Sequence, residues 1–347
     1  DPYACKGCNE CVRVCEDDAL RTLTQSAEST GRLTRAWDFW QSLPTTSPEY
    51  IRIESLDEKI GALETLLLDK TNFKSIVGGD GACLGCGEKT VVHLFTATVE
   101  ALMQPRVKKQ VERIDALIKK LETHIRLKMA DTLNLSDIVA IDQALDSLHN
   151  KEVTLSNLSA SLDSEDEGKT IDADWLKWVA HLLDKLRLLK WQYTEGVTKR
   201  GRARMGMINS TGCTSVWAST YPFNPYPFPW ANHLFQDSTS MAMGVFEGHM
   251  AKMADGFKAV RMAELELAGE YDHAKHDEFF TYFNWQQFTE EEFHLCPPVV
   301  AVGGDGAMYD IGFQNLSRMM MTGKPVKVLV LDTQVYSNTG GQACTSG

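Results

Sequence analysis

The chain has 347 residues, of which 43% are hydrophobic and 24% are charged, and its formal net charge is −12. This length suffices for two or three domains with at least one sizeable core, and no stretch has the roughly 20 consecutive apolar residues of a membrane helix. Because no basic stretch is set apart to bind phosphates, the acidic balance argues against nucleic acid as a partner.

The nine cysteines indicate the compartment and a metal-binding function. Their number is odd, several lie two residues apart, and the first residues lack the apolar run of a secretion signal, which together favour metal ligation over disulfides. We therefore expect a cytoplasmic protein with reduced thiols. The chain opens inside a cysteine motif and stops shortly after a glycine-rich turn, so we expect a segment of a larger polypeptide.

Residues 1–25 carry four closely spaced cysteines in the pattern Cys5-x-x-Cys8-x-x-Cys11-x-x-x-Cys15. Three thiolates at this spacing hold one 4Fe–4S cluster, and in two-cluster ferredoxins the fourth cysteine ligates the other cluster. We therefore predict a ferredoxin-like 4Fe–4S segment here, with a zinc site or a group of free thiols as the alternative.

Residues 26–104 are expected to form a linker and the start of a second domain. Residues 26–74 have a mixed composition with a helical pattern over 56–67, and we interpret them as the linker. A glycine-rich loop with Cys83 and Cys86 follows, and we expect a helix over 90–103 packed beneath it.

Residues 105–199 differ in composition from both neighbours, since glycine is scarce and no cluster of reactive side chains occurs. Apolar residues recur with a helical period over 111–125 and again over 175–189. Between them lies the polar run 163–168, which is typical of an exposed loop. We therefore predict a helical insertion.

The last region, residues 200–347, contains a predicted parallel sheet. Continuous apolar runs at 298–303 and 327–332 are typical of strands that are buried on both faces. The helical spacing over 311–322 completes a strand–helix–strand unit. In such sheets a ligand binds beyond the carboxyl ends of the strands.

Asp305 and Thr333 follow these two strands, where they can offer a carboxylate and a hydroxyl to a divalent ion. Gly304 and Gly306 allow backbone amides to approach phosphate oxygens. The pattern predicts a diphosphate site that includes a divalent cation, and a plain turn in a sheet without a nucleotide is the alternative.

Several motifs together resemble one enzyme family. They are Cys83-Leu84-Gly85-Cys86-Gly87-Glu88, Asn209-Ser210-Thr211-Gly212-Cys213, Pro229-Trp230-Ala231-Asn232, Gly304-Asp305-Gly306 and Asp332-Thr333-Gln334-Val335-Tyr336-Ser337-Asn338-Thr339-Gly340-Gly341-Gln342. With the cysteine segment in front, the chain resembles the pyruvate:ferredoxin (flavodoxin) oxidoreductases of the 2-oxoacid:ferredoxin oxidoreductase family. The resemblance covers residues 1–25, 75–104 and 200–347. It implies an α/β fold, a thiamine-diphosphate-binding doubly wound parallel sheet, which the insertion at 105–199 interrupts.

The resemblance also implies which residues bind thiamine diphosphate and Mg²⁺. Asp305, Thr333 and the backbone carbonyl of Val335 are expected to bind Mg²⁺. Asn338 is expected to face the substrate as a catalytic residue. The residues implied to contact the cofactor are Glu88, Cys213, Gly304, Asp305, Gly306, Ala307, Thr333 and Asn338.

A 4Fe–4S cluster next to the thiamine is a further implication of the resemblance, with Cys83, Cys86 and Cys213 as three of its ligands. In the family the fourth ligand lies further downstream than this chain extends. Cys344 is an alternative fourth ligand, whereas Cys296, next to an apolar run, is expected to be a core thiol.

The implied reaction is the oxidative decarboxylation of a 2-oxoacid, with pyruvate as the first candidate, to acyl-CoA and CO₂. Coenzyme A accepts the acyl group, and the electrons pass through 4Fe–4S clusters to ferredoxin or flavodoxin. Other domains or chains of the enzyme, expected to be a homo-oligomer, complete the site. The alternatives are the same chemistry on 2-oxoglutarate or an aryl pyruvate, and a non-catalytic iron–sulfur electron carrier.

Overall fold

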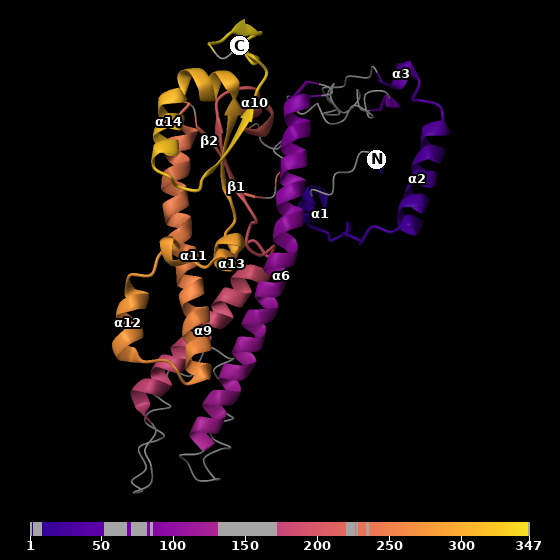
Figure 1. Ribbon diagram of the computed structural model, residues 1–347. Helices are drawn as coiled ribbons and strands as arrows, with labels where there is room; N and C mark the ends of the chain where they lie inside the picture. The colour runs from indigo at the N-terminus through magenta and orange to yellow at the C-terminus, as the bar shows by residue number, and fades with distance from the viewer. Residues whose placement is uncertain are drawn as a thin grey trace, which may run out of the picture. The chain divides into compact units, whose positions relative to one another are not determined.

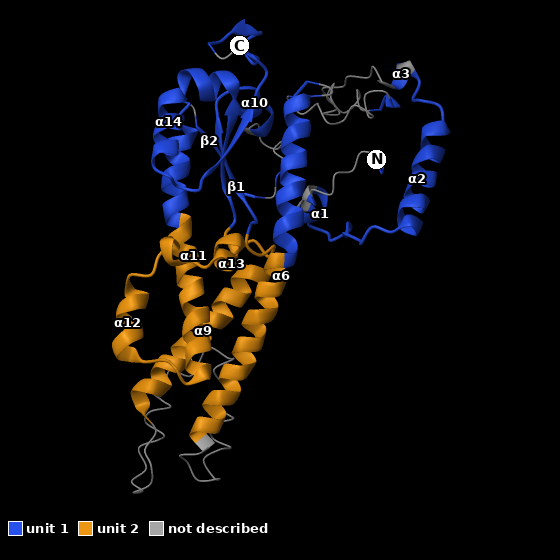
Figure 2. Ribbon diagram, viewed as in Figure 1, with its two compact units in different colours: residues 1–105, 203–248, 297–347 blue, residues 106–202, 249–296 orange. Residues whose placement is uncertain are grey.

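The computed structural model describes residues 2, 9–51, 68–70, 82–83, 86–130, 172–219, 226, 228–233 and 236–345. They belong to two compact units, coloured separately in Figure 2: residues 1–105, 203–248 and 297–347 form unit 1, and residues 106–202 and 249–296 form unit 2. The predicted insertion corresponds to the first stretch of unit 2, and the domain borders drawn from the sequence remain predictions. The expected helical pattern at 56–67 and the polar run at 163–168 lie outside the described residues.

Unit 1 is built on a four-stranded parallel sheet in the order β2-β1-β3-β4 (Figure 1). The strands are β1 (Gly206–Ser210), β2 (Trp230–His233), β3 (Val299–Gly304) and β4 (Lys327–Leu331). The apolar runs at 298–303 and 327–332 are therefore confirmed as neighbouring parallel strands, with Ala301 opposite Val328. The α/β class with a parallel sheet is confirmed as well.

Short elements connect and flank these strands. The cysteine segment contains α1 (Glu10–Val14), and α2 (Ala27–Ser42) and α3 (Pro48–Ile51) follow. Helix α10 (Cys213–Ser219) follows β1, and a π-helix (Gly306–Ile311) leads from β3 into α14 (Phe313–Met321). The small antiparallel pair of β5 (Val335–Tyr336) and β6 (Gln342–Ala343) follows β4.

The core of unit 1 joins the inner strands to α10 and the first part of α6 (Gly87–Ala130). Trp217 of α10 is 1% exposed and packs in one cluster with Val92 of α6 and with Val300 and Val302 of β3. This packing fixes the starts of α6 and α10 beside the sheet. The three loops that carry the predicted site residues therefore start from buried elements.

Helix α6 corrects the expectation of a helix that ends near residue 103. It continues without a break through Pro105 to Ala130. The composition changes near residue 104 because the helix packs against different elements before and after this point. Its apolar face itself continues, from Met103, which is 3% exposed, to Ile114, which is fully buried. Burial of this continuous stripe outweighs the hydrogen bond that Pro105 cannot donate.

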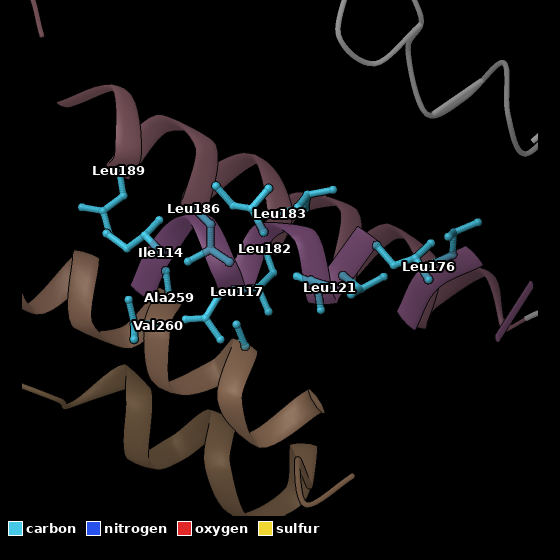
Figure 3. Packing of buried hydrophobic residues seen from close by; sticks show 14 of the residues in the cluster. Ile114, Leu117, Leu121, Leu176, Leu182, Leu183, Leu186, Leu189, Ala259 and Val260 are labelled. Atoms are coloured by element: carbon cyan, nitrogen blue, oxygen red, sulfur yellow. The ribbon is translucent and has the colours of Figure 1, made fainter. Parts of the chain in front are cut away.

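Unit 2 is helical and includes the rest of α6, α9 (Ala173–Thr194), α12 (His273–Thr281), a 3₁₀ turn (Trp285–Gln287), α13 (Glu290–Leu295) and most of α11 (Ser238–Ala268). The apolar periodicities of the sequence form its core, in which Ile114 and Leu117 pack with Leu183 and Leu186 of α9 and with Val260 of α11 (Figure 3). Within the described ranges, no helix combines the length and apolar character that crossing a membrane requires.

Candidate cofactor site

A cavity of about 180 Å³ opens at the carboxyl ends of three adjacent strands of unit 1. Loops that follow β1, β3 and β4 line it, together with Glu88 from the first turn of α6. Every residue that the sequence assigned to the thiamine diphosphate and Mg²⁺ lies at this cavity. These residues are Glu88, Cys213, Gly304, Asp305, Gly306, Ala307, Thr333, Val335 and Asn338.

At the cavity, the Thr333 hydroxyl lies as far from two other oxygens as adjacent ligands of one small cation lie from each other. The Thr333 hydroxyl lies 3.2 Å from Asp305 Oδ1 and 3.2 Å from the backbone oxygen of Val335. In an octahedral site with Mg²⁺–oxygen bonds of 2.0–2.1 Å, adjacent ligands are about 3 Å apart. The three groups predicted to bind Mg²⁺ therefore fit that ion.

The Asp305 carboxylate is fully buried and is stabilised in its charged form. Burial would raise its pKa, but hydrogen bonds from the backbone amide of Thr333, from the thiol of Cys344 and from the Thr333 hydroxyl lower the pKa below its ordinary value. The Cys344 thiol donates to Oδ2 over 3.3 Å, and this cysteine is itself buried. Cys344, the alternative cluster ligand, thus contacts the predicted Mg²⁺ ligand in this structure.

Gly306 is required by the shape of the cavity. A Cβ atom at this position would come within 2.5 Å of the Tyr336 ring. That ring is held in place by a hydrogen bond from the Tyr336 hydroxyl to Asp310 of the π-helix. The hydrogen bond to the carboxylate raises the pKa of Tyr336 to about 12, so this tyrosine remains a neutral donor at physiological pH.

Glu88 brings a second carboxyl group to the cavity. Its burial raises the pKa above the ordinary value of a glutamate, although the hydrogen bond from Thr214 acts in the opposite direction. The Thr214 hydroxyl donates to Glu88 Oε2 over 3.3 Å, which connects the first turns of α10 and α6. The carboxyl group is therefore oriented before any ligand binds.

Cys213 lines this cavity, and Cys83 and Cys86 influence its thiol. Burial raises the pKa of its thiol to about 11, and the charges of Glu88, Cys86 and Cys83 contribute in the same direction. The Cys86 sulfur accepts a hydrogen bond from the Lys89 amide over 3.5 Å, in the first turn of α6. The structure therefore brings the three cysteines assigned to one cluster to the same part of unit 1 as Asp305.

The cysteines do not form a closed metal centre as they stand. In the part of the chain that the structure describes, no three His, Cys, Asp or Glu side chains are arranged to hold a metal ion. Of the ferredoxin-like group, Cys5 and Cys8 lie outside the described residues, Cys11 is exposed and Cys15 is half-buried. Cys296 is buried in unit 2 and donates to the Glu292 carbonyl, as expected for a core thiol.

Gln236 is a cavity residue that the sequence did not reveal. It has a left-handed backbone conformation with φ of 60°, and its Nε2 donates to the Thr211 carbonyl over 2.8 Å. Its buried Oε1 has no hydrogen-bond partner within the described residues. Its position just after the strand β2 could have indicated that it reaches the cavity. However, Trp230–His233 is too short and too polar to be predicted as a strand from the sequence.

The comparison with protein families defines the class of this site. Residues 293–347 match the family model described as "Thiamine pyrophosphate enzyme, C-terminal TPP binding domain". These residues include β3, β4 and the loops with Asp305 and Thr333. The last stretch of unit 1, residues 297–347, is therefore similar to the C-terminal thiamine-diphosphate-binding domain of such enzymes.

The chain is also similar to individual proteins that are named as pyruvate oxidoreductases. The chain is 30% identical to pyruvate-flavodoxin oxidoreductase of Klebsiella pneumoniae and 29% identical to pyruvate:ferredoxin oxidoreductase of Moorella thermoacetica, each over 44% of this chain and 16% of the relative. It is 26% identical to "Pyruvate dehydrogenase [NADP(+)]" of Cryptosporidium parvum over 44% of this chain and 12% of the relative. The chain is thus a homologue of one segment of the pyruvate:ferredoxin (flavodoxin) oxidoreductases, and it spans less than a fifth of the length of these relatives.

Proposed function

We propose that this chain is the part of a 2-oxoacid oxidoreductase that binds thiamine diphosphate and carries electrons away from it, with pyruvate as the substrate. The observation that carries the proposal is the group of three oxygens from Asp305, Thr333 and Val335, which lies in the same cavity as Glu88 and Cys213. The names of the relatives support pyruvate as the oxidised substrate.

Residues of the chain would hold the cofactor by its diphosphate end. Asp305, Thr333 and the Val335 carbonyl would bind Mg²⁺, and the amides after Gly304 would contact the phosphate oxygens. A cavity of about 180 Å³ is below the roughly 300–1,000 Å³ of a complete ligand pocket. This size supports a shared site, in which other domains or chains of a homo-oligomer enclose the rest of the cofactor.

Bound thiamine diphosphate supplies the nucleophilic carbon and the electron sink that cleavage of a 2-oxoacid carboxylate requires. Asn338, exposed at the rim of the cavity, is suited to orient the substrate through its amide. Glu88, which Thr214 orients, would offer a second carboxyl group to the cofactor at the same cavity. Asp305, which is fully buried, would offer the divalent ion a carboxylate that Thr333 and Cys344 hold in place.

Electrons would leave the cavity through a 4Fe–4S cluster ligated by Cys83, Cys86 and Cys213, with a fourth ligand from elsewhere in the enzyme. From there they would pass to the cluster of the segment that contains Cys11 and Cys15. The relatives are named for flavodoxin, ferredoxin and NADP⁺, so the external acceptor differs within this group. We propose ferredoxin or flavodoxin as the acceptor, coenzyme A as the acyl acceptor and the cytoplasm as the location.

Cofactor analysis combined with turnover tests this function. Full-length enzyme purified without oxygen should contain thiamine, magnesium, iron and sulfide and should reduce ferredoxin or flavodoxin when pyruvate and coenzyme A are added. D305A should lose thiamine and magnesium while it retains the iron of the N-terminal cysteine segment. Turnover with 2-oxoglutarate or an aryl pyruvate, but not with pyruvate, would show that this other 2-oxoacid is the substrate. Iron and sulfide without thiamine would instead indicate an electron carrier.

A further inference from the structure

Glu100 is a buried carboxylate on α6 that contacts two arginines from distant parts of unit 1. The residue is 6% exposed, and its oxygens face Arg204, which precedes β1, and Arg13 of α1 at 3.4 Å. The side-chain amide of Gln104 donates to Oε1 over 3.2 Å. A carboxylate removed from water requires such partners, because an unpaired buried charge is strongly destabilising.

Arg13 connects this carboxylate to the cysteine segment. It lies in α1 between Cys11 and Cys15, and its side chain is 14% exposed. Within the segment, the Ala19 amide donates to the Cys15 sulfur over 3.3 Å, which orders the chain locally. The bond between Arg13 and Glu100, 87 residues apart in the sequence, attaches α1 to α6, and the two helices lie side by side in Figure 1.

The same helix carries the cofactor cavity at its start. Helix α6 begins directly after Cys86, and Glu88 in its first turn lines the cavity. Glu100 is 12 residues further along, which corresponds to about 18 Å of helix. A long helix with a buried face is a stiff connection, so the point at which α1 is attached determines how far the cysteine segment lies from the cavity.

We propose that Glu100 is a positioning residue, which holds the cysteine segment of residues 9–25 on α6 through Arg13 and so sets the distance that electrons travel from the thiamine cavity. This inference rests on the proposed function. Electron transfer slows steeply as the distance between donor and acceptor grows, so a segment released from α6 would receive electrons more slowly.

The contacts of Glu100 allow the link between Arg13 and Glu100 to be removed without unfolding unit 1. When Arg13 is removed, Glu100 keeps Arg204 and Gln104 as partners, so its charge remains paired. R13M, which retains an unbranched side chain, should therefore leave unit 1 folded. E100Q is the complementary variant, because it keeps the shape of the carboxylate and removes its charge.

Hydrogen exchange on the anaerobically purified full-length enzyme tests the attachment. R13M and E100Q should each raise exchange at residues 9–25 about tenfold, as expected for the loss of a partly buried ion pair. Exchange at residues 299–308, which form β3 and the cavity, should not change in R13M. The matched control is R113M, which removes an exposed pair with Glu264 at 2.6 Å and should leave both regions unchanged.

A kinetic comparison separates positioning from general stability. Exchange of labelled CO₂ into the carboxylate of pyruvate needs only the thiamine cavity, whereas reduction of the external acceptor also needs the electron path. R13M should lower acceptor reduction about tenfold relative to CO₂ exchange, in line with the loss of local order. Equal losses in both reactions would overturn the proposal, because they would indicate a general effect on the fold.

The outcomes distinguish this inference from the function on which it rests. If R13M and E100Q leave hydrogen exchange at residues 9–25 at the wild-type rate, the proposed attachment of this segment to α6 is refuted, even if the enzyme is fully active. If the enzyme contains no thiamine, the proposed function is wrong whatever the exchange shows. A rise in exchange throughout unit 1 in both variants would also overturn the positioning role.

Discussion

At the scale of single residues, the site depends on contacts that the strand ends impose. Asp305 and Thr333 were predictable because each follows an apolar run, and adjacent parallel strands end at the same edge of a sheet. Gln236 was not predictable as a cavity residue. Its place depends on β2, whose pairing with β1 is a long-range contact that no local pattern indicates. The contact of Cys344 with Asp305 was not predictable either, because it joins residues 39 positions apart in the sequence.

Gly306→Ala should weaken thiamine diphosphate binding, because the new methyl group would come within 2.5 Å of the Tyr336 ring. The ring cannot move without losing its hydrogen bond to Asp310. We expect a loss of affinity of at least about tenfold, the cost of a small overpacking effect, in calorimetric titration with thiamine diphosphate and Mg²⁺. Gly244→Ala is the control, since nothing lies within 4 Å of its added Cβ; an equal loss there would contradict the account.

Cys213→Ser should separate the two cofactors. The hydroxyl is a poor cluster ligand compared with a thiolate, so the iron content should fall by about four atoms per chain. Thiamine diphosphate should still bind within a factor of about three, because the Mg²⁺ ligands are untouched and a serine fills nearly the same space. Iron and sulfide analysis and cofactor titration measure the two effects, and unchanged iron would exclude Cys213 as a ligand.

At the scale of elements, the sequence predicted the buried ones and missed those whose form depends on their neighbours. The strand β3 and the helix α9 have apolar patterns that match their burial. The run that forms β4 was expected to be buried on both faces, but β4 is the last strand in the sheet order, and of its residues only Leu331 is buried. The sequence did not indicate that α6 passes through Pro105 or that a π-helix follows Asp305, since packing in the folded chain determines both. Propensity describes local preferences, and tertiary contacts override them at these points.

The core of unit 2 should respond to truncation according to burial. Leu186 is fully buried among residues of α6, α9 and α11, whereas Leu188 on the same helix is 53% exposed. Leu186→Ala should lower the free energy of unfolding by about 2–5 kcal/mol, and Leu188→Ala by less than about 0.5 kcal/mol. Urea denaturation measures both, and similar values would contradict the packing of α9.

Asp115 should make unit 2 sensitive to acid. Hydrogen bonds from Lys119 and Lys190 lower its pKa from 3.8 to about 2. A lowered pKa in the folded state stabilises the fold above pH 3.8, and this contribution is lost as the pH falls toward 2. The stability difference between the wild type and D115N should therefore shrink below pH 4; a difference that is constant from pH 7 to 3 would refute the pairing.

At the scale of the whole molecule, the proposed metal-dependent diphosphate site and the cysteines proposed for an electron path lie in the same compact unit. Cys213 lines the cavity with Asp305, and its thiol is influenced by Cys83 and Cys86. This proximity favours an oxidoreductase over a simple decarboxylase, which needs no electron path. The sequence indicated this combination because Cys83, Cys86 and Asp305 lie in glycine-rich motifs and Thr333 follows an apolar run. The extension of unit 2 to residues 249–296 depends instead on long-range helix packing.

Electron paramagnetic resonance with Mn²⁺ in place of Mg²⁺ tests the central claim most directly. In the full-length enzyme with thiamine diphosphate, the bound Mn²⁺ should show hyperfine coupling to phosphorus, and D305A should abolish the signal because Asp305 is the one side-chain carboxylate proposed to hold the ion. Phosphorus coupling that persists unchanged in D305A, or a bound Mn²⁺ without any phosphorus coupling, would show that the ion and the diphosphate are held elsewhere.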